Sequence, residues 1–104
     1  MIYFAYQVTP VAGKRDALIE TNGRFKKIFE SVGGKEIGSF RVGLGQGEGT
    51  LVYFLAYEDM TAATEAWKKL EKDSEYQALV KQTDPMTASV TSGLLLPLPN
   101  SPLR

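Results

Sequence analysis

The chain contains no cysteine and no histidine. It therefore has no thiolate nucleophile and no Ser-His or Cys-His dyad, and it lacks the ligands of zinc fingers, iron–sulfur clusters and histidine- or cysteine-ligated haem. Its carboxylates show no paired spacing that would bring them to one ion. We accordingly expect no metal and no cofactor. The lack of cysteine also means that folding needs no disulfide, which suits a reducing cytoplasm.

The chain also has no excess of positive or negative residues and no long apolar run. Twelve Lys and Arg residues balance twelve Asp and Glu residues, so the formal net charge is zero. A neutral chain offers no general basic field for a phosphate backbone, and we expect no nucleic-acid partner. Residues 1–10 have neither the positive start nor the apolar run of a signal peptide or a membrane span. The sequence therefore predicts a cytoplasmic protein without a membrane partner.

A length of 104 residues, 43% of them hydrophobic, leaves room for one core. We expect a single domain over residues 1–104. Residues 2–8 are rich in aromatic and β-branched side chains and are followed by Thr9 and Pro10. That composition and that ending are typical of a strand.

A helical pattern begins at about Gly13. Apolar positions recur there every three or four residues until the pair Gly33 and Gly34, which predicts an amphipathic helix and its stop. The stripe comprises Leu18, Asn22, Phe25, Phe29 and Val32. A glycine at position 23 could instead mark a turn that splits the segment. Because the stripe continues in phase across this position, we expect one helix.

Residues 37–42 and 50–57 are two further strand-like runs, and the stretch 43–49 between them contains four glycines. So much glycine disfavours a regular element. We therefore expect an antiparallel hairpin with a flexible tip at residues 43–49.

The second half of the chain predicts helices followed by a strand. Asp59 or Thr61 can cap a helix, and Asp73 can cap a second, shorter one. Residues 86–96 are typical of the last strand. The remaining residues, 97–104, form a proline-rich C-terminal arm.

The order strand, helix, strand, strand, helix, strand is that of the α+β ferredoxin-like fold, an antiparallel sheet with two helices on one face. A sheet with one wet face should alternate apolar and polar residues. Residues 51–57 instead carry leucines and tyrosines on one side and Val52, Phe54 and Ala56 on the other. Leaving the second face in water would expose an unusually large apolar area. We expect a second copy of the sheet to cover it, which makes a homodimer.

Four stretches of the chain carry a family resemblance. They are the strand that ends before Pro10-Val11-Ala12-Gly13-Lys14, the segments EAWKKL (65–70) and KDSEYQAL (72–79), and the ending LLPLPNSPL (95–103). In order and spacing they resemble the NIPSNAP-like family of the dimeric α+β barrel superfamily, over nearly the whole chain. The sequence departs from that family at residues 3–6, where the family has a Glu-Leu-Arg core. It departs also at Ser74 and Tyr76, where the family favours Pro and Trp.

The resemblance implies two protomers packed sheet against sheet and a ligand cleft between the sheet and the helices of each protomer. NIPSNAP-like proteins have no agreed reaction. Other members of the superfamily include cofactor-independent monooxygenases, haem-dependent enzymes and binding proteins, so the fold alone does not choose a function.

Asn22 is the sharpest candidate for this cleft, because it interrupts the apolar stripe between Leu18 and Phe25. A buried amide needs hydrogen-bond partners, which a ligand carbonyl or peroxy oxygen would supply. The alternative is a structural partner, either a nearby backbone group or a sheet tyrosine. Phe25 would line the same cleft. Tyr6 and Tyr53 offer hydroxyls to a ligand. The alternative is that their rings only fill the core while their hydroxyls contact water.

Trp67 and Arg41 complete the set of candidate site residues. Trp67 lies at helical spacing with Ala63 and Leu70 and could stack on a flat ligand, or it is simply part of the core. Arg41 could neutralise an anionic ligand or an enolate. Its alternative is an exposed edge or a salt bridge with a helix carboxylate.

Three functional hypotheses follow. In the first, the homodimer binds a small, mostly apolar ligand in the cleft. In the second, it is a cofactor-independent monooxygenase-like enzyme acting on an aromatic or enolisable substrate, with Asn22, Trp67 and Tyr53 holding the reactive form. In the third, it is a structural dimer with a filled core and no ligand site. Whether the chain is an enzyme stays open, and the lack of an acid–base pair favours binding.

Overall fold

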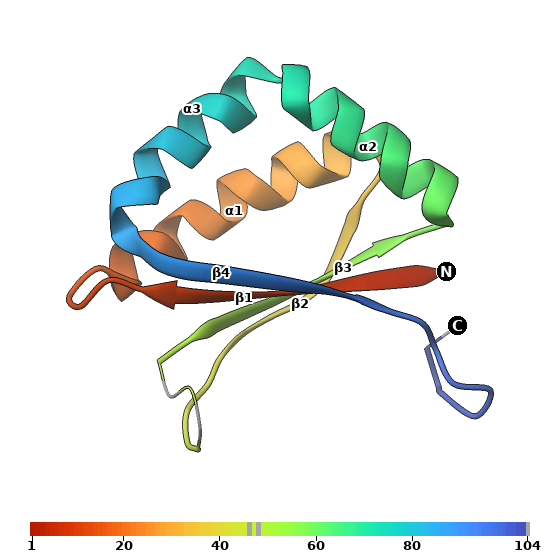
Figure 1. The fold of residues 1–104 in the computed structure, drawn as a ribbon, viewed down its shortest axis with the longest axis horizontal. Coiled ribbons are helices and arrows are strands. Elements are labelled where there is room, and N and C mark those ends of the chain that lie inside the picture. The colour runs from red at the N-terminus through yellow and green to blue at the C-terminus, as the bar shows by residue number, and fades with distance from the viewer. Residues whose placement is uncertain (46, 48, 104) are drawn as a thin grey trace.

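A computed structural model describes residues 1–45, 47 and 49–103 of the chain. Its elements follow in the order β1 (Ile2–Pro10), α1 (Arg15–Ser31), β2 (Lys35–Arg41), β3 (Leu51–Tyr57), α2 (Met60–Lys72), α3 (Ser74–Thr83), the 3₁₀ turn η1 (Asp84–Met86) and β4 (Thr87–Leu95). The four-stranded sheet has the order β2-β3-β1-β4 and its strand pairs are antiparallel. Figure 1 shows the helices on one face of it. The predicted α+β ferredoxin-like fold is confirmed.

The observed strands differ from the predicted ones by a few residues. β1 continues to Pro10, where its register with β4 shifts. The predicted hairpin of β2 and β3 is confirmed, although positions 46 and 48 of the expected tip lie outside the described residues. The expected arm after β4 contains a turn in which the N–H of Ser101 donates to the carbonyl of Leu98 at 2.9 Å.

α1 is one continuous helix, so the interpretation that carried the apolar stripe across Gly23 is confirmed. The helix buries one face through residues at helical spacing, namely Leu18, Thr21 and Ile28. It ends where Gly33 adopts a positive φ of 103°. The N–H of Gly34 then donates to the carbonyl of Phe29 at 2.9 Å, which satisfies one of the free carbonyls at the helix end.

Two aspartates divide the second helical region into α2 and α3. The carboxylate of Asp59 accepts a hydrogen bond from the N–H of Ala62, and that of Asp73 accepts one from Tyr76, both at 2.8 Å. Each bond satisfies a backbone donor that the first helical turn leaves free. The cap predicted at Asp73 is confirmed, and of the two candidates for α2 it is Asp59 that makes the bond.

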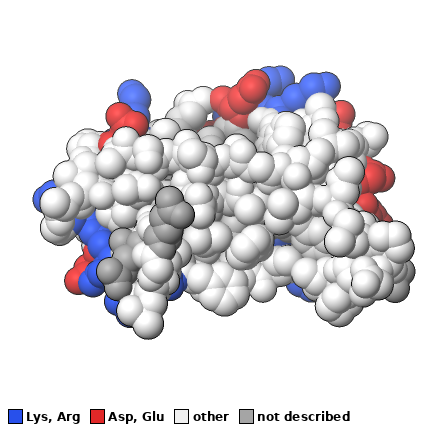
Figure 2. All heavy atoms as spheres, turned by 60° about the horizontal axis from the view of Figure 1, so that its bottom comes forward, with Lys and Arg blue, Asp and Glu red and all other residues white. Residues whose placement is uncertain are grey.

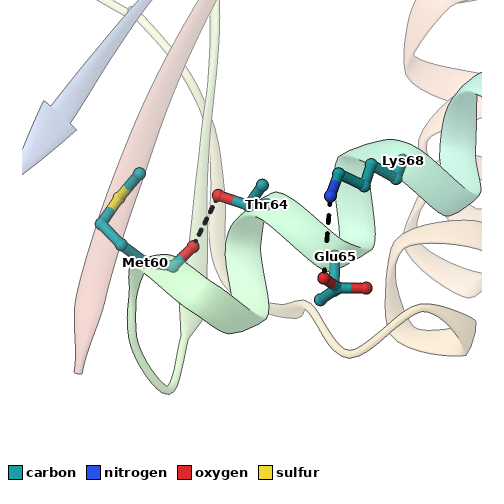
Figure 3. Close-up of polar contacts among 4 residues, drawn as sticks. All are labelled: Met60, Thr64, Glu65 and Lys68. Carbon is teal, nitrogen blue, oxygen red and sulfur yellow. Dashed lines mark hydrogen bonds and ion pairs between the residues drawn. The ribbon is translucent and has the colours of Figure 1, made fainter.

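The outer face of α2 is solvated. The hydroxyl of Thr64 donates to the carbonyl of Met60 at 2.8 Å, and Nζ of Lys68 lies 3.9 Å from a carboxylate oxygen of Glu65 (Figure 3). Exposed ion pairs of this kind stabilise a protein by at most about 1 kcal/mol. The described helices include none that is both long enough and apolar enough to cross a membrane.

The tightest core lies on the side of the sheet that α2 covers. It consists of Phe4 and Leu55 with Tyr57, Ala63 and Ala66. The small alanine side chains allow the helix to approach the sheet closely. The ring of Trp67 meets that of Phe4 edge-on, with 5.0 Å between the centroids. A second buried cluster joins the helices to one another through Ile28, Leu70 and Leu79.

The opposite face of the sheet carries no helix and is apolar at its centre. In the strand register Tyr3 lies opposite Ala56 and Ala5 lies opposite Phe54, so both central strands place apolar side chains there. Phe40 of β2 packs edge-on against Phe54 and is 59% exposed. In Figure 2, which turns this side forward, charged side chains stand at the margins of the described surface and leave its middle free. The prediction that both faces of β1 and β3 are apolar is confirmed.

Two glycines offer a matched pair of substitutions. A Cβ at Gly34 would lie 3.1 Å from Cε1 of Tyr57 and 3.2 Å from the carbonyl oxygen of Phe29, whereas at Gly23 it would meet nothing within 4 Å. We expect Gly34→Ala to lower the free energy of unfolding by about 1–3 kcal/mol through overpacking. Gly23→Ala should raise it by about 0.5–1 kcal/mol through helix propensity. Urea unfolding measures both, and a fully stable Gly34→Ala variant would contradict the close packing of Tyr57 on this backbone.

Candidate functional site

A cavity of about 280 Å³ lies between the sheet and helices α1 and α3, toward the end of the sheet that α2 does not cover. Its apolar wall includes Val8, Leu18, Phe25, Phe29, Leu55 and Val80. Small-molecule pockets commonly span about 300–1,000 Å³. The cavity is slightly below the lower end of that range and suits a small ligand. The space beside Asn22 is therefore not filled by Phe25 and Phe29, which line it.

Three aromatic rings form the helical side of this cavity. Phe25 and Phe29 of α1 stack with 6.1 Å between their centroids, and Tyr76 of α3 meets them edge-on at 6.3 and 6.1 Å. Figure 1 shows α3 lying farther from the sheet than α1. Large rings here take the place of the alanines under α2, so the helices pack on one another and leave space above the strands.

The predicted site residues are brought together in part. Tyr6, Asn22, Phe25 and Tyr53 all line the cavity. Tyr6 and Tyr53 face it side by side, because they lie opposite one another in the register of β1 and β3.

Trp67 and Arg41 do not line the cavity. Trp67 packs into the core against Phe4, which matches its alternative interpretation. Arg41 is exposed at the end of β2 and lines a separate hollow of about 190 Å³, which shares Asn22 and Tyr53 with the cavity. β2 is an edge strand, so Arg41 lies at the margin of the sheet, beside the hollow and away from the cavity.

Asn22 has a structural partner. Its Nδ2 donates to Oγ of Ser39 at 3.3 Å, and that hydroxyl donates to Oε1 of Glu36 at 2.6 Å. The alternative role of Asn22 is thus partly realised, with a serine as partner in place of a backbone group or a tyrosine. The chain of bonds ties α1 to β2 at the cavity wall.

Glu36 is a lining residue that the sequence did not reveal, because the predicted strand began one residue later. Glu36 lies opposite Leu55 and Ser39 opposite Tyr53, so both face the helices. Residues three apart in a regular strand point to opposite faces. The irregularity at Ile37, an extra residue in the ladder, brings Glu36 and Ser39 to the same face.

Four hydroxyl residues of the lining were also missed, namely Thr21, Tyr76, Thr83 and Thr87. Thr21 lies three residues after Leu18 on α1, and Thr83 and Tyr76 lie on α3. Helical spacing from Leu18 was a signal for Thr21, since it places both on the buried stripe. For Tyr76 and Thr83 the spacing shows a buried face but does not show which cavity that face borders.

Burial raises the pKa of the tyrosines around the cavity above 10.0. This holds for Tyr6, Tyr53 and Tyr76. The neighbouring Tyr76 adds to the shift of Tyr6, and the carboxylate of Glu36 adds to that of Tyr53. At neutral pH all three are uncharged phenols, as an ordinary tyrosine is, and each can donate a hydrogen bond.

The carboxylates at the cavity are Glu36 and Asp84. Within the part of the chain that the structure describes, no three His, Cys, Asp or Glu side chains gather as metal ligands would. What the lining can do is to hold a small molecule by apolar contact and to orient it by hydrogen bonds.

A family model described as NIPSNAP matches residues 5–102 of the chain. The chain belongs to the NIPSNAP family. The resemblance that the sequence segments carry is therefore confirmed, and the match extends over almost the whole chain. A comparison with curated proteins gives no match.

Solved structures share the fold of this NIPSNAP chain. A NIPSNAP domain protein from Burkholderia xenovorans has a TM-score of 0.88 at 19% identity, covering 98% of this chain and 99% of its own. A NIPSNAP family protein from Agrobacterium tumefaciens has a TM-score of 0.86 at 24% identity, with 99% and 98% covered. A candidate antibiotic biosynthesis monooxygenase from Nitrosomonas europaea has a TM-score of 0.71 at 12% identity, with 94% and 99% covered. At these identities the likeness is one of fold.

The phenol of Tyr57 provides a test of the electrostatics on this side of the sheet. Its oxygen is buried and meets no partner in hydrogen-bond geometry among the described residues. Burial raises its pKa from 10.0 to about 12, with Tyr6 adding to the shift and the nearby Trp67 opposing it. Because the folded pKa is the higher one, the stabilising effect is complete below pH 10.0 and is lost as the pH rises toward 12.

We expect Tyr57→Phe to remove this part of the alkaline loss. Above pH 10.0 the unchanged chain should lose up to about 2–3 kcal/mol more unfolding free energy than the variant does. Urea unfolding at stepwise pH measures the difference. Identical pH profiles for the two proteins would show that Tyr57 ionises normally in the fold.

Proposed function

We propose that this NIPSNAP chain forms a homodimer that binds a small, mostly apolar ligand in the cavity between the sheet and helices α1 and α3. The observation that carries this proposal is the cavity itself, a space of about 280 Å³ beside a closely packed core. The cavity is partly open to water, so its apolar walls are in contact with solvent. A ligand of matching shape would withdraw this apolar surface from water, which is favourable.

A few polar groups are available to orient such a ligand. The hydroxyls of Tyr6, Tyr53 and Tyr76 and the amide of Asn22 interrupt walls that are otherwise mainly apolar. Apolar walls with a small number of placed hydrogen-bonding groups are typical of small-molecule sites.

The homodimer is proposed from the helix-free face of the sheet. Phe40 and Leu95 are exposed there and Phe54 is half-buried between the strands. No charged residue stands at the centre of this surface (Figure 2). Contiguous apolar surface of this kind is unfavourable in water. A second copy offers an equally apolar and self-complementary face, as a two-fold dimer requires.

A second candidate function is that of a cofactor-independent monooxygenase-like enzyme acting on an aromatic or enolisable substrate. The likeness in fold to the candidate monooxygenase from Nitrosomonas europaea favours it. So does the presence of Asn22 and Tyr53 together at the cavity wall, since oxygenation without a cofactor depends on positioning more than on an acid–base pair. Oxygen uptake with quinol-type substrates separates this enzyme from a binding protein.

Filling the cavity should abolish binding. Val90 of β4 lines the cavity and is 58% exposed, so a larger side chain can occupy the space without disturbing the core. We expect Val90→Trp to weaken the binding of acetonaphthone, a neutral apolar ketone, at least about tenfold in isothermal titration calorimetry. Ala78→Trp, on the exposed side of α3, is the matched control and should bind normally. Unchanged affinity in a folded Val90→Trp variant would place the ligand elsewhere.

Charging the helix-free face should separate the protomers. Phe54 lies at its centre, so Phe54→Lys would place a charge in the proposed dimer interface. Sedimentation equilibrium should give the mass of two 11.5 kDa chains for the unchanged protein and of one chain for the variant. Ala78→Lys, away from this face, should remain a dimer. A monomeric unchanged protein at micromolar concentration would overturn the proposed assembly.

A further inference from the structure

The charged groups that line the cavity are all acidic. They are Glu36 of β2 and Asp84 of η1, and no Lys or Arg belongs to the lining among the described residues. Oε1 of Glu36 accepts the hydroxyl proton of Ser39 at 2.6 Å, which fixes the carboxylate at the wall. An anion that entered the cavity would meet negative charge without a counter-charge.

The threonine hydroxyls of the lining donate their hydrogen bonds to backbone carbonyls. Thr21 donates to the carbonyl of Leu18 at 2.7 Å, and Thr83 donates to that of Leu79 at 3.0 Å. Thr87 donates to the carbonyl of Thr83 at 2.9 Å. Each hydroxyl therefore presents only lone pairs to the cavity, and lone pairs do not stabilise a carboxylate or a phosphate.

Donors to a ligand come from three tyrosines and from the second N–H of the Asn22 amide, whose first N–H donates to Ser39. Tyr6, Tyr53 and Tyr76 line the cavity from β1, β3 and α3, and each is an uncharged phenol at neutral pH. A phenol O–H pairs well with a carbonyl oxygen, because neither group brings a formal charge out of water. The donors thus suit an uncharged acceptor.

We infer that the cavity takes an uncharged apolar molecule that carries a hydrogen-bond-accepting oxygen, of the ketone, aldehyde or quinone class, and that it rejects carboxylates and phosphates. This inference rests on the proposed function, because it names the ligand class of the same site. A cation would be attracted by Glu36 and Asp84, but Asp84 is exposed, so water screens its attraction. A cation would also lose its hydration on entering a mainly apolar cavity, which a neutral ketone does not.

The rival is an amphipathic anion whose charged end reaches Arg41. That residue lines the smaller hollow, which borders the cavity at Asn22 and Tyr53. An anion bound in this way would keep its apolar part in the cavity and its charge at Arg41. The test must therefore separate the cavity from the hollow.

The experiment compares three naphthyl probes by isothermal titration calorimetry at neutral pH and constant ionic strength. They are acetonaphthone, which is neutral, naphthoate, which is an anion, and naphthylmethylamine, which is a cation. We expect naphthoate to bind at least about tenfold more weakly than acetonaphthone. Glu36→Gln keeps an acceptor for Ser39 and removes the charge, so it should strengthen naphthoate binding and narrow the gap. Glu20→Gln removes an exposed charge from α1 outside the lining and should leave both affinities unchanged.

Each outcome decides the inference. Binding of naphthoate as tight as that of acetonaphthone would overturn it while leaving the proposed binding function standing. So would naphthoate binding that is lost in Arg41→Gln, or amine binding tighter than ketone binding. If none of the probes binds, the proposed function and the ligand class fall together. Selective ketone binding that responds to Glu36→Gln but not to Glu20→Gln supports the inference.

Discussion

The pleat of the two central strands is the constraint on which the molecule depends. Successive side chains of β1 and β3 point to opposite faces of the sheet, and both sets are mainly apolar. Each face must therefore be withdrawn from water, yet the helices of one chain lie on a single side (Figure 1). The helical layer covers one face within the protomer. The other face buries Tyr3 and Ala56 but leaves Phe40 and Leu95 exposed, and we propose that a second molecule covers it.

The helical cover is uneven, and the candidate site results from that unevenness. Alanines of α2 let it settle onto Phe4 and Leu55, whereas the rings of Phe25 and Tyr76 keep α1 and α3 from closing on the other end of the strands. The space that remains has walls of hydrocarbon and aromatic ring. Its threonine hydroxyls donate to backbone carbonyls, and burial raises the pKa of Tyr6 further above neutral pH. The cavity is therefore mainly apolar, with a few uncharged hydrogen-bonding groups.

Periodicity and capping were sufficient to predict the fold. The stripe through Phe25 and the aspartate at position 73 located helices because local chemistry decides where a helix runs and stops. The same periodicity predicted that Asn22 faces the cleft, and Asn22 does line the cavity. It did not reveal Glu36. An extra residue in β2 turns the Glu36 side chain toward the helices, whereas simple alternation from Ser39 predicts the opposite face. Nor could spacing tell whether Trp67 meets a ligand or Phe4, since both roles require the same helical face.

We propose that the two faces of the sheet have different occupants, with a small molecule on the helical side. Nuclear Overhauser effects between bound acetonaphthone and methyl groups test this most directly. Contacts to Leu18, Val80 and Val90, which line the cavity, are the predicted result. Contacts confined to Val52 and Leu95, on the helix-free face, would contradict the account.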